Sequence, residues 1–168
     1  MKKRYLIAGA YGLAGAALAA KLWSRPREVD WDEHRSALHH SEYSRFAEVD
    51  GLRVHYQEAG DASAPPLLLI HGFCASTFVW SDVLLTLAAA GYRVIAMDLV
   101  GFGFSDKPRD GEYTIEYQAR MVVRLMDRLG IERATLVGSS YGGAVAIACA
   151  LDAPGRVAIG HRRRHRRR

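Results

Sequence analysis

The chain has 168 residues, 49% of them hydrophobic and 24% charged, which is the composition of a globular domain with a core and excludes a disordered chain. Its net charge of +5 comes from the six arginines of the final RRRHRRR, because the remaining 17 basic residues face 18 acidic ones. A nucleic-acid interface would therefore rest on that tail alone. The two cysteines, Cys74 and Cys149, make no disulfide framework and are both predicted to be buried.

The N-terminal segment begins with three positive charges at residues 2–4, followed by an uncharged, mostly apolar run at 5–20. This order is typical of an export signal or a signal anchor. As a helix the run would be about 24 Å long, a little short of a bilayer core. The ALA at 17–19 also fits a cleavage site. Residues 1–23 are therefore predicted to be a signal peptide or a membrane anchor, and the protein to be membrane-anchored or exported.

A different interpretation of the same segment rests on Gly9, Gly12 and Gly15. They resemble the G-x-x-G-x-x-G turn of extended short-chain dehydrogenases, in which a helix N-terminus binds a pyrophosphate. Such a unit continues into a second apolar strand, whereas the residues that follow here are polar. A dinucleotide-binding head is therefore the weaker alternative, and no cofactor is expected.

Residues 24–44 are predicted to be a linker or a surface helix. Their acidic and histidine side chains follow no recognised metal-ligand spacing, so we expect a solvated surface and no metal site. The residues in question are Asp30, Asp32, Glu33, His34, His39 and His40.

From residue 45 the pattern becomes regular. Two alternating runs around Asp50-Gly51 predict a β-hairpin. Short continuous apolar runs then predict strands buried on both faces, and these runs alternate with segments of helical periodicity. The succession predicts a mixed α/β sheet with right-handed parallel crossovers. The elements expected after the hairpin are strands near 65–70, 92–98 and 134–138, and helices near 81–90, 115–129 and 141–151.

The segment Gly138-Ser139-Ser140-Tyr141-Gly142 fits G-x-S-x-G between a predicted strand and a predicted helix. Such a turn strains the backbone of Ser140 and lifts its hydroxyl above the sheet edge. Gly138 and Gly142 flank the serine because a Cβ at either position would collide with the turn. Ser140 is therefore predicted to be a nucleophile, and the alternative is a chance glycine turn with an exposed serine.

Three segments in order resemble the α/β-hydrolase fold superfamily: LLLIHGFCAS at 67–76, AMDLVGFGFSDKP at 96–108 and TLVGSSYGGAVA at 135–146. The first resembles the third strand of that family with its His-Gly oxyanion loop, the second the loop after the fourth strand, and the third the nucleophile elbow. The resemblance covers about residues 45–157 and implies the N-terminal part of an α/β-hydrolase fold, incomplete at its C-terminus. In the family's sheet order the strand at 134–138 would lie beside the strand at 66–70.

The resemblance also implies roles for individual residues. Ser140 would be the nucleophile, and the backbone N–H groups of Tyr141 and Phe73 would be the oxyanion donors. His71, Gly72 and Asp98 would shape or stabilise the loop rather than act as general base or triad acid. A serine at the elbow argues against epoxide hydrolases and haloalkane dehalogenases, which place an aspartate there. What remains is hydrolysis of an ester, lipid, thioester or related acyl substrate, or cleavage of an activated C–C bond.

The sequence departs from the family pattern after Val157, where AIGHRRRHRRR takes the place of a sixth strand, a cap, the triad acid and the catalytic histidine. Residues 158–168 are expected to be an unstructured basic tail. They would either bind nucleic acid or anionic lipid, or belong to a truncated or frame-shifted product. His161 and His165 have nothing to hold their position. The chain is thus expected to be a serine hydrolase cut before its acid and histidine. The alternatives are a catalytically inactive fragment or pseudo-enzyme, or a membrane-tethered binding module.

Overall fold

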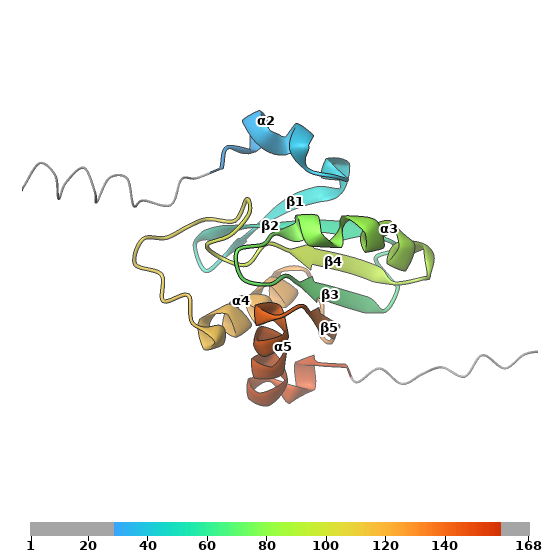
Figure 1. Cartoon of the computed structure of the whole chain (residues 1–168). Coiled ribbons are helices and arrows are strands. Elements are labelled where there is room, and N and C mark those ends of the chain that lie inside the picture. Colours follow the sequence, from blue (N-terminus) through green and yellow to red (C-terminus); the bar gives the residue numbers. More distant parts are fainter. Residues whose placement is uncertain (1–28, 159–168) are drawn as a thin grey trace, which may run out of the picture.

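The computed structural model describes residues 29–158. Within them, five strands form one sheet in the order β1-β2-β4-β3-β5 (Figure 1). β1 and β2 are antiparallel, as are β2 and β4, whereas β4, β3 and β5 run parallel. The mixed sheet with parallel crossovers predicted from the sequence is therefore confirmed, including the pairing of β5 with β3. The strands are β1 (Ser44–Val49), β2 (Leu52–Ala59), β3 (Pro66–Ile70), β4 (Arg93–Met97) and β5 (Thr135–Gly138).

The hairpin of β1 and β2 turns at Asp50 and Gly51, with Val49 paired to Leu52. Both turn residues have positive φ, 50° and 78°, which is the backbone conformation of a two-residue turn that matches the twist of its strands. The Asp-Gly pair predicted this turn because it tolerates positive φ at both positions.

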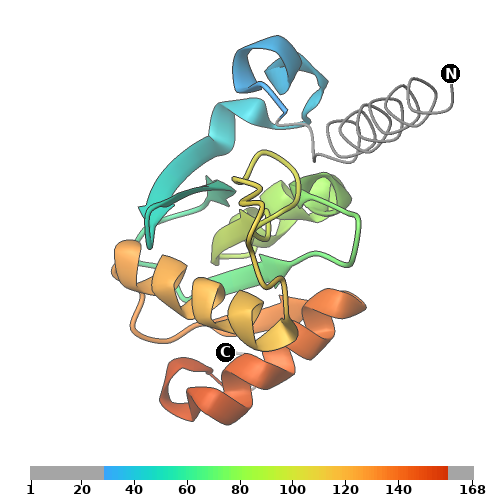
Figure 2. The same ribbon diagram turned by 90° about the vertical axis from the view of Figure 1, so that its left-hand side faces the viewer.

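Helices cover both faces of the sheet. α3 (Ser81–Ala89) packs on one face, and α4 (Ile115–Arg128) and α5 (Tyr141–Asp152) lie side by side on the other (Figures 1 and 2). Successive residues of β3 point to opposite faces, so Leu68 packs in the core under α4 and α5 while Leu69 packs under α3. This explains the continuous apolar runs: each residue of such a strand meets a hydrophobic layer.

The described residues before the hairpin belong to the segment expected to be a linker or a surface helix. They form α2 (Trp31–His34) and the 3₁₀ turns η1 (Arg35–Ala37) and η2 (Ser41–Tyr43). Leu38 is buried, and the Gln57 side chain donates to the carbonyl oxygens of His39 and His40. The segment is therefore docked on the sheet. This docking is not predictable from the sequence, because the segment lacks the periodicity of a helix or a strand.

On the side of β5 that faces away from β3, the described residues make one β-bridge, just before the strand begins. Ala134 bridges Val157 in parallel, and the Ala158 N–H donates to the Ala134 carbonyl at 2.8 Å. Among residues 29–158, Thr135–Gly138 pair only with β3. The chain after η4 (Pro154–Arg156) thus meets the sheet where a further parallel strand would start.

Two sequence predictions lie outside the described residues: the signal or anchor at 1–23 with its glycine turn, and the basic tail beyond residue 158. None of the helices within 29–158 is long and apolar enough to span a bilayer.

The first turn of α5 lies against the end of β3 with no room for a side chain. A Cβ placed on Gly142 would be 2.2 Å from the Ile70 carbonyl oxygen, which no relaxation of a flexible side chain can relieve. The next residue, Gly143, has only ordinary contacts, with its nearest neighbour 3.5 Å from an added Cβ. This close approach sets the position of α5 on the sheet.

We therefore expect Gly142→Ala to lower the free energy of unfolding by about 2 kcal/mol or more, because α5 must move away from β3. Gly143→Ala is the matched control and should leave stability unchanged or raise it by up to about 1 kcal/mol, since alanine favours the helix. Urea denaturation followed by circular dichroism measures both. Equal effects of the two substitutions would contradict the close approach.

Candidate active site

Ser140 lies in the turn between β5 and α5 with φ 52° and ψ −116°, a region that residues other than glycine rarely occupy. The neighbouring Ser139 N–H donates to the Ile70 carbonyl at 3.0 Å, which ties the turn to β3. A Cβ on Gly138 would lie 2.2 Å from the Gly142 carbonyl oxygen. The strained serine and the two crowded glycines expected from G-x-S-x-G are thus present, and the Ser140 residue is exposed.

The loop after β3 lies next to this serine. A Cβ built on Gly72 would be 3.5 Å from the Cβ of Ser140. Among the described residues, neither the Phe73 N–H nor the Tyr141 N–H has a hydrogen-bond acceptor, and Tyr141 is the first residue of α5, where helix N–H groups are free. One unpaired donor therefore belongs to the residue after Ser140, and the other to the residue after Gly72, which lies beside Ser140. We call residues His71–Thr77 the oxyanion loop.

His71 has both ring nitrogens engaged. Its Nε2 accepts a hydrogen bond from the Leu99 N–H at 3.0 Å, so the ring proton is on Nδ1, which donates to the Gly72 carbonyl at 2.7 Å. Burial lowers the pKa of His71 and outweighs the opposing effects of the Gly72 carbonyl and the Asp98 charge, which favours the same neutral ring. This geometry supports a loop-shaping role, since neither nitrogen is available to take a proton from Ser140.

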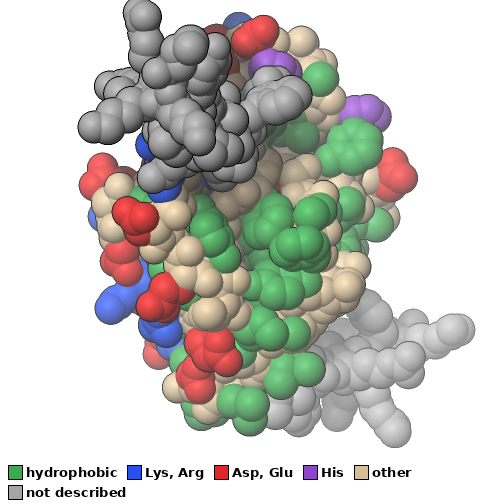
Figure 3. All heavy atoms as spheres, turned by 60° about the vertical axis from the view of Figure 1, so that its left-hand side comes forward, with side chains coloured by type: hydrophobic (Ala, Val, Ile, Leu, Met, Phe, Trp, Pro, Cys, Tyr) green, Lys and Arg blue, Asp and Glu red, His purple; other side chains and the backbone are tan. Residues whose placement is uncertain are grey.

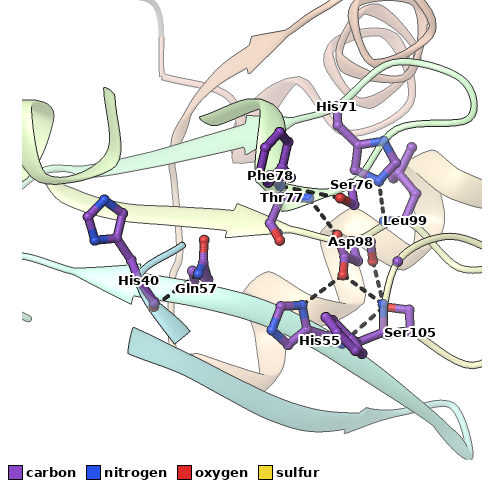
Figure 4. Close-up of polar contacts among 12 residues, drawn as sticks. His40, His55, Gln57, His71, Ser76, Thr77, Phe78, Asp98, Leu99 and Ser105 are labelled. Atoms are coloured by element: carbon purple, nitrogen blue, oxygen red, sulfur yellow. Dashed lines mark hydrogen bonds and ion pairs between the residues drawn. The ribbon is translucent and has the colours of Figure 1, made fainter. Parts of the chain in front are cut away.

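Asp98 follows β4 and is fully buried, and Figure 4 shows its carboxylate at the centre of the polar contacts. Oδ1 accepts from the Thr77 N–H at 2.6 Å, and Oδ2 accepts from the Phe104 N–H at 2.9 Å. The third donor is His55, whose Nδ1 lies 2.7 Å from Oδ2. This arrangement fits the loop-stabilising role expected for Asp98, whose side chain is 0% exposed.

Aromatic rings surround the serine side of the loop. The ring of Phe73 is in edge contact with those of Phe102 and Tyr141, at centroid distances of 5.6 and 6.0 Å. The Phe73 residue is 68% exposed. Figure 3 shows hydrophobic side chains gathered over the middle of one face of the molecule.

An open groove of about 560 Å³ runs beside the same loop, with Cys74, Phe78, Val79 and Phe102 in its lining. Cys74 is exposed with φ 53°, so the prediction that both cysteines are buried is wrong for this one. The oxyanion loop turns it outward. Cys149 is buried as predicted, and burial raises the pKa of its thiol to about 11.

None of the five histidines within 29–158 forms a hydrogen bond to Ser140, and no three metal-ligating side chains gather among these residues. The residue that the sequence analysis missed is His55, which it gave no role. The alternation of β2 gave no signal of its burial, because His55 shares a side of the strand with Arg53 and Gln57, opposite Val54 and Tyr56. His55 is buried because Trp31, Phe46 and Phe104 cover that side.

Comparison with known proteins gives a family assignment. The model of the α/β hydrolase fold family matches residues 65–158. The chain is 47% identical over 113 residues to the dihydrolipoyllysine-residue acetyltransferase component of the acetoin cleaving system of Cupriavidus necator, covering 67% of this chain and 29% of that protein. It is 38% identical over 109 residues to 2-hydroxymuconate semialdehyde hydrolase of a Pseudomonas species, covering 64% and 38%.

Among solved structures, epoxide hydrolase A of Mycobacterium thermoresistibile superposes with a TM-score of 0.66 at 35% identity, covering 68% of this chain and 36% of that one. The chain therefore spans less than half the length of each relative named. The matched region contains the oxyanion loop, Asp98 and the turn at Ser140. Together with the sheet order, this match shows that the chain belongs to the α/β hydrolase fold family.

Proposed function

We propose that this chain carries the nucleophile and the oxyanion site of a serine hydrolase that acts on an acyl substrate. The observation that carries the proposal is the strained, exposed Ser140 beside Gly72, with the N–H groups of the following residues, Phe73 and Tyr141, unpaired among the described residues. A strained backbone conformation persists only where the surrounding structure imposes it, and such residues cluster at active sites.

In this proposal the Ser140 hydroxyl oxygen attacks the carbonyl carbon of the substrate and gives its proton to a general base. The carbonyl oxygen becomes an oxyanion, which accepts from Phe73 N–H and Tyr141 N–H. Each such donor contributes about 3 kcal/mol to the transition state. Collapse expels the leaving group, which takes up the proton, and water then hydrolyses the acyl-serine. The base and its acid partner would come from outside residues 29–158, since no described histidine bonds to Ser140.

The nature of the nucleophile narrows the substrate class. A serine forms an acyl ester, so the elbow favours esters, lipids, thioesters or activated C–C bonds over epoxides, although a solved epoxide hydrolase is among the structures that superpose. The 2-hydroxymuconate semialdehyde hydrolase among the relatives supports including C–C bonds. The apolar lining beside the oxyanion loop suits an acyl group with a hydrophobic part.

The test compares hydrolysis of a nitrophenyl ester by two proteins. One is the 168-residue chain, and the other is an extended product in which residues after Val157 are replaced by the reading frame that encodes a further strand, an acid and a histidine. We expect no turnover by the 168-residue chain above its Ser140→Ala variant, because a hydroxyl without a base is a weak nucleophile. The extended product should hydrolyse the ester, and Ser140→Ala should reduce its kcat by about 10⁴-fold or more.

Ser139→Ala is the matched control, since the side chain of this exposed neighbour makes no hydrogen bond within the described residues. It should retain activity in the extended product. An extended product that loses nothing on Ser140→Ala would refute the nucleophile. Ser140-dependent turnover by the 168-residue chain would contradict the expected inactivity and would mean that one of its own histidines acts as the base.

We also propose that residues 1–23 direct the protein to a membrane or across one, on the strength of the basic head and the apolar run at 5–20. Fractionation of tagged chains with and without residues 1–23 tests this. The intact chain should be found with membranes or be exported, and the shortened chain should remain in the soluble cytosolic fraction. If both forms stay in that fraction, the targeting proposal fails.

A third proposal concerns self-association through β5. The strand pairs only with β3 among the described residues, and Val137 is 37% exposed beside this edge. Free strand edges pair with other chains. We expect oligomers in light scattering and fewer of them after Val137→Lys, because an edge lysine opposes pairing. Val83→Lys on α3, at 39% exposure, is the control and should change nothing. A monomeric unmodified chain would contradict the proposal.

A further inference from the structure

His55 is fully buried in the middle of β2, and its side chain is directed at the carboxylate of Asp98 (Figure 4). The two residues stand 43 positions apart in the sequence and meet because β2 and β4 are neighbours in the sheet. The Asp98 N–H also donates to the His55 carbonyl at 2.9 Å. His55 has no part in the acyl-transfer chemistry proposed above, so its burial needs another explanation.

The Asp98 carboxylate is held by N–H donors alone. Its three donors are His55 Nδ1–H, Thr77 N–H and Phe104 N–H, and among the described residues no lysine or arginine pairs with it. A buried carboxylate is costly unless its oxygens are hydrogen-bonded. The His55 ring therefore supplies the one side-chain donor that keeps this carboxylate in its place between the two loops.

Two consecutive residues after β4, Asp98 and Leu99, hold the two ends of the oxyanion loop. His71 accepts from the Leu99 N–H, and the Thr77 N–H donates to the Asp98 carboxylate. Phe73, whose N–H is unpaired among the described residues and follows Gly72 beside Ser140, lies between these two anchors. If Asp98 shifts, the Thr77 anchor is lost and the Phe73 donor moves with the loop.

Aromatic rings enclose His55 on the remaining sides. Trp31, Phe46 and Phe104 lie at centroid distances of 5.5, 5.2 and 5.3 Å from its ring. Its Nε2 has no hydrogen-bond partner within the described residues. Among the described residues, the ring of His55 therefore makes a single hydrogen bond, from Nδ1 to the Asp98 carboxylate.

We propose that His55 is a positioning residue: through its Nδ1–H bond to Asp98 it fixes the oxyanion loop and thereby the Phe73 N–H beside Ser140. The effect of this positioning on catalysis rests on the proposed function, in which the Phe73 N–H binds the oxyanion. The linkage from His55 through Asp98 to Thr77 is nevertheless measurable without substrate.

The test separates the hydrogen bond from the packing of the ring. His55→Phe fills the aromatic surroundings but removes the donor, whereas His55→Asn leaves a smaller side chain but keeps an N–H group at the place of Nδ1. We expect the amide hydrogens of Thr77 and Phe104 to exchange at least about 10-fold faster in His55→Phe and within about 3-fold of the unmodified chain in His55→Asn. Exchange is followed by NMR on the 168-residue chain.

Gln57→Met is the matched control. Gln57 is buried two positions along β2 and its amide group bonds the N-terminal segment, not Asp98. It should leave the Thr77 and Phe104 exchange rates within about 3-fold of the unmodified chain, even if it lowers stability. The reverse order of the two His55 variants, with phenylalanine protective and asparagine not, would show a packing role and overturn the proposal.

If both variants fail to fold, the proposal is tested in the unmodified chain by finding which ring nitrogen of His55 carries the proton. Nitrogen-15 spectra should show the ring proton on Nδ1, in a hydrogen bond that slows its exchange with water. A proton on Nε2 alone would overturn the proposal. These measurements involve no substrate, so an inactive Ser140 would refute the proposed function while leaving the His55 result standing.

Discussion

The structure depends above all on the close approach of one turn to one strand end. The turn that carries Ser140 lies so near the carbonyl of Ile70 that Gly142 has no space for a Cβ, and the Ser139 N–H bonds the same carbonyl. This contact fixes α5 on the sheet, and it brings the serine beside the loop that follows β3. Without it, the strained backbone at Ser140 would have nothing to hold it, because such a conformation persists only where its surroundings impose it.

A second strand end completes the arrangement. β3, β4 and β5 run parallel and are neighbours, so the residues that follow their carboxyl ends meet at one edge of the sheet. β3 leads into the oxyanion loop, β4 into Asp98 and Leu99, and β5 into Ser140. The loop is held from β4 by hydrogen bonds at His71 and Thr77, while its middle stays free to present an N–H group. Rigid ends and an unpaired centre are what the proposed binding of an oxyanion by this loop requires.

The segment before the hairpin packs against the same group of residues around His55 and Asp98. Trp31 is in ring contact with His55 and Phe104, and the Gln57 amide holds the backbone at His39 and His40. Removing this segment would expose the His55 ring to water on a side where its Nε2 has no partner within residues 29–158. Residues 29–43, which have no helical or strand periodicity, thus help to exclude water from the His55–Asp98 pair.

The sequence by itself determined the features that arise from local sterics and periodicity. The Asp50-Gly51 turn, the strands buried on both faces and the crowding of Gly138 by Gly142 follow from side-chain size and spacing within a few residues, whereas Gly142 is crowded by Ile70 of another strand. Only the tertiary structure decided that His55 meets Asp98, that Cys74 is exposed and that residues 29–43 dock on the sheet. These outcomes depend on which strands are neighbours and on how a loop is anchored at its ends. Such contacts join residues tens of positions apart, and no local pattern encodes the partner that each side chain will meet.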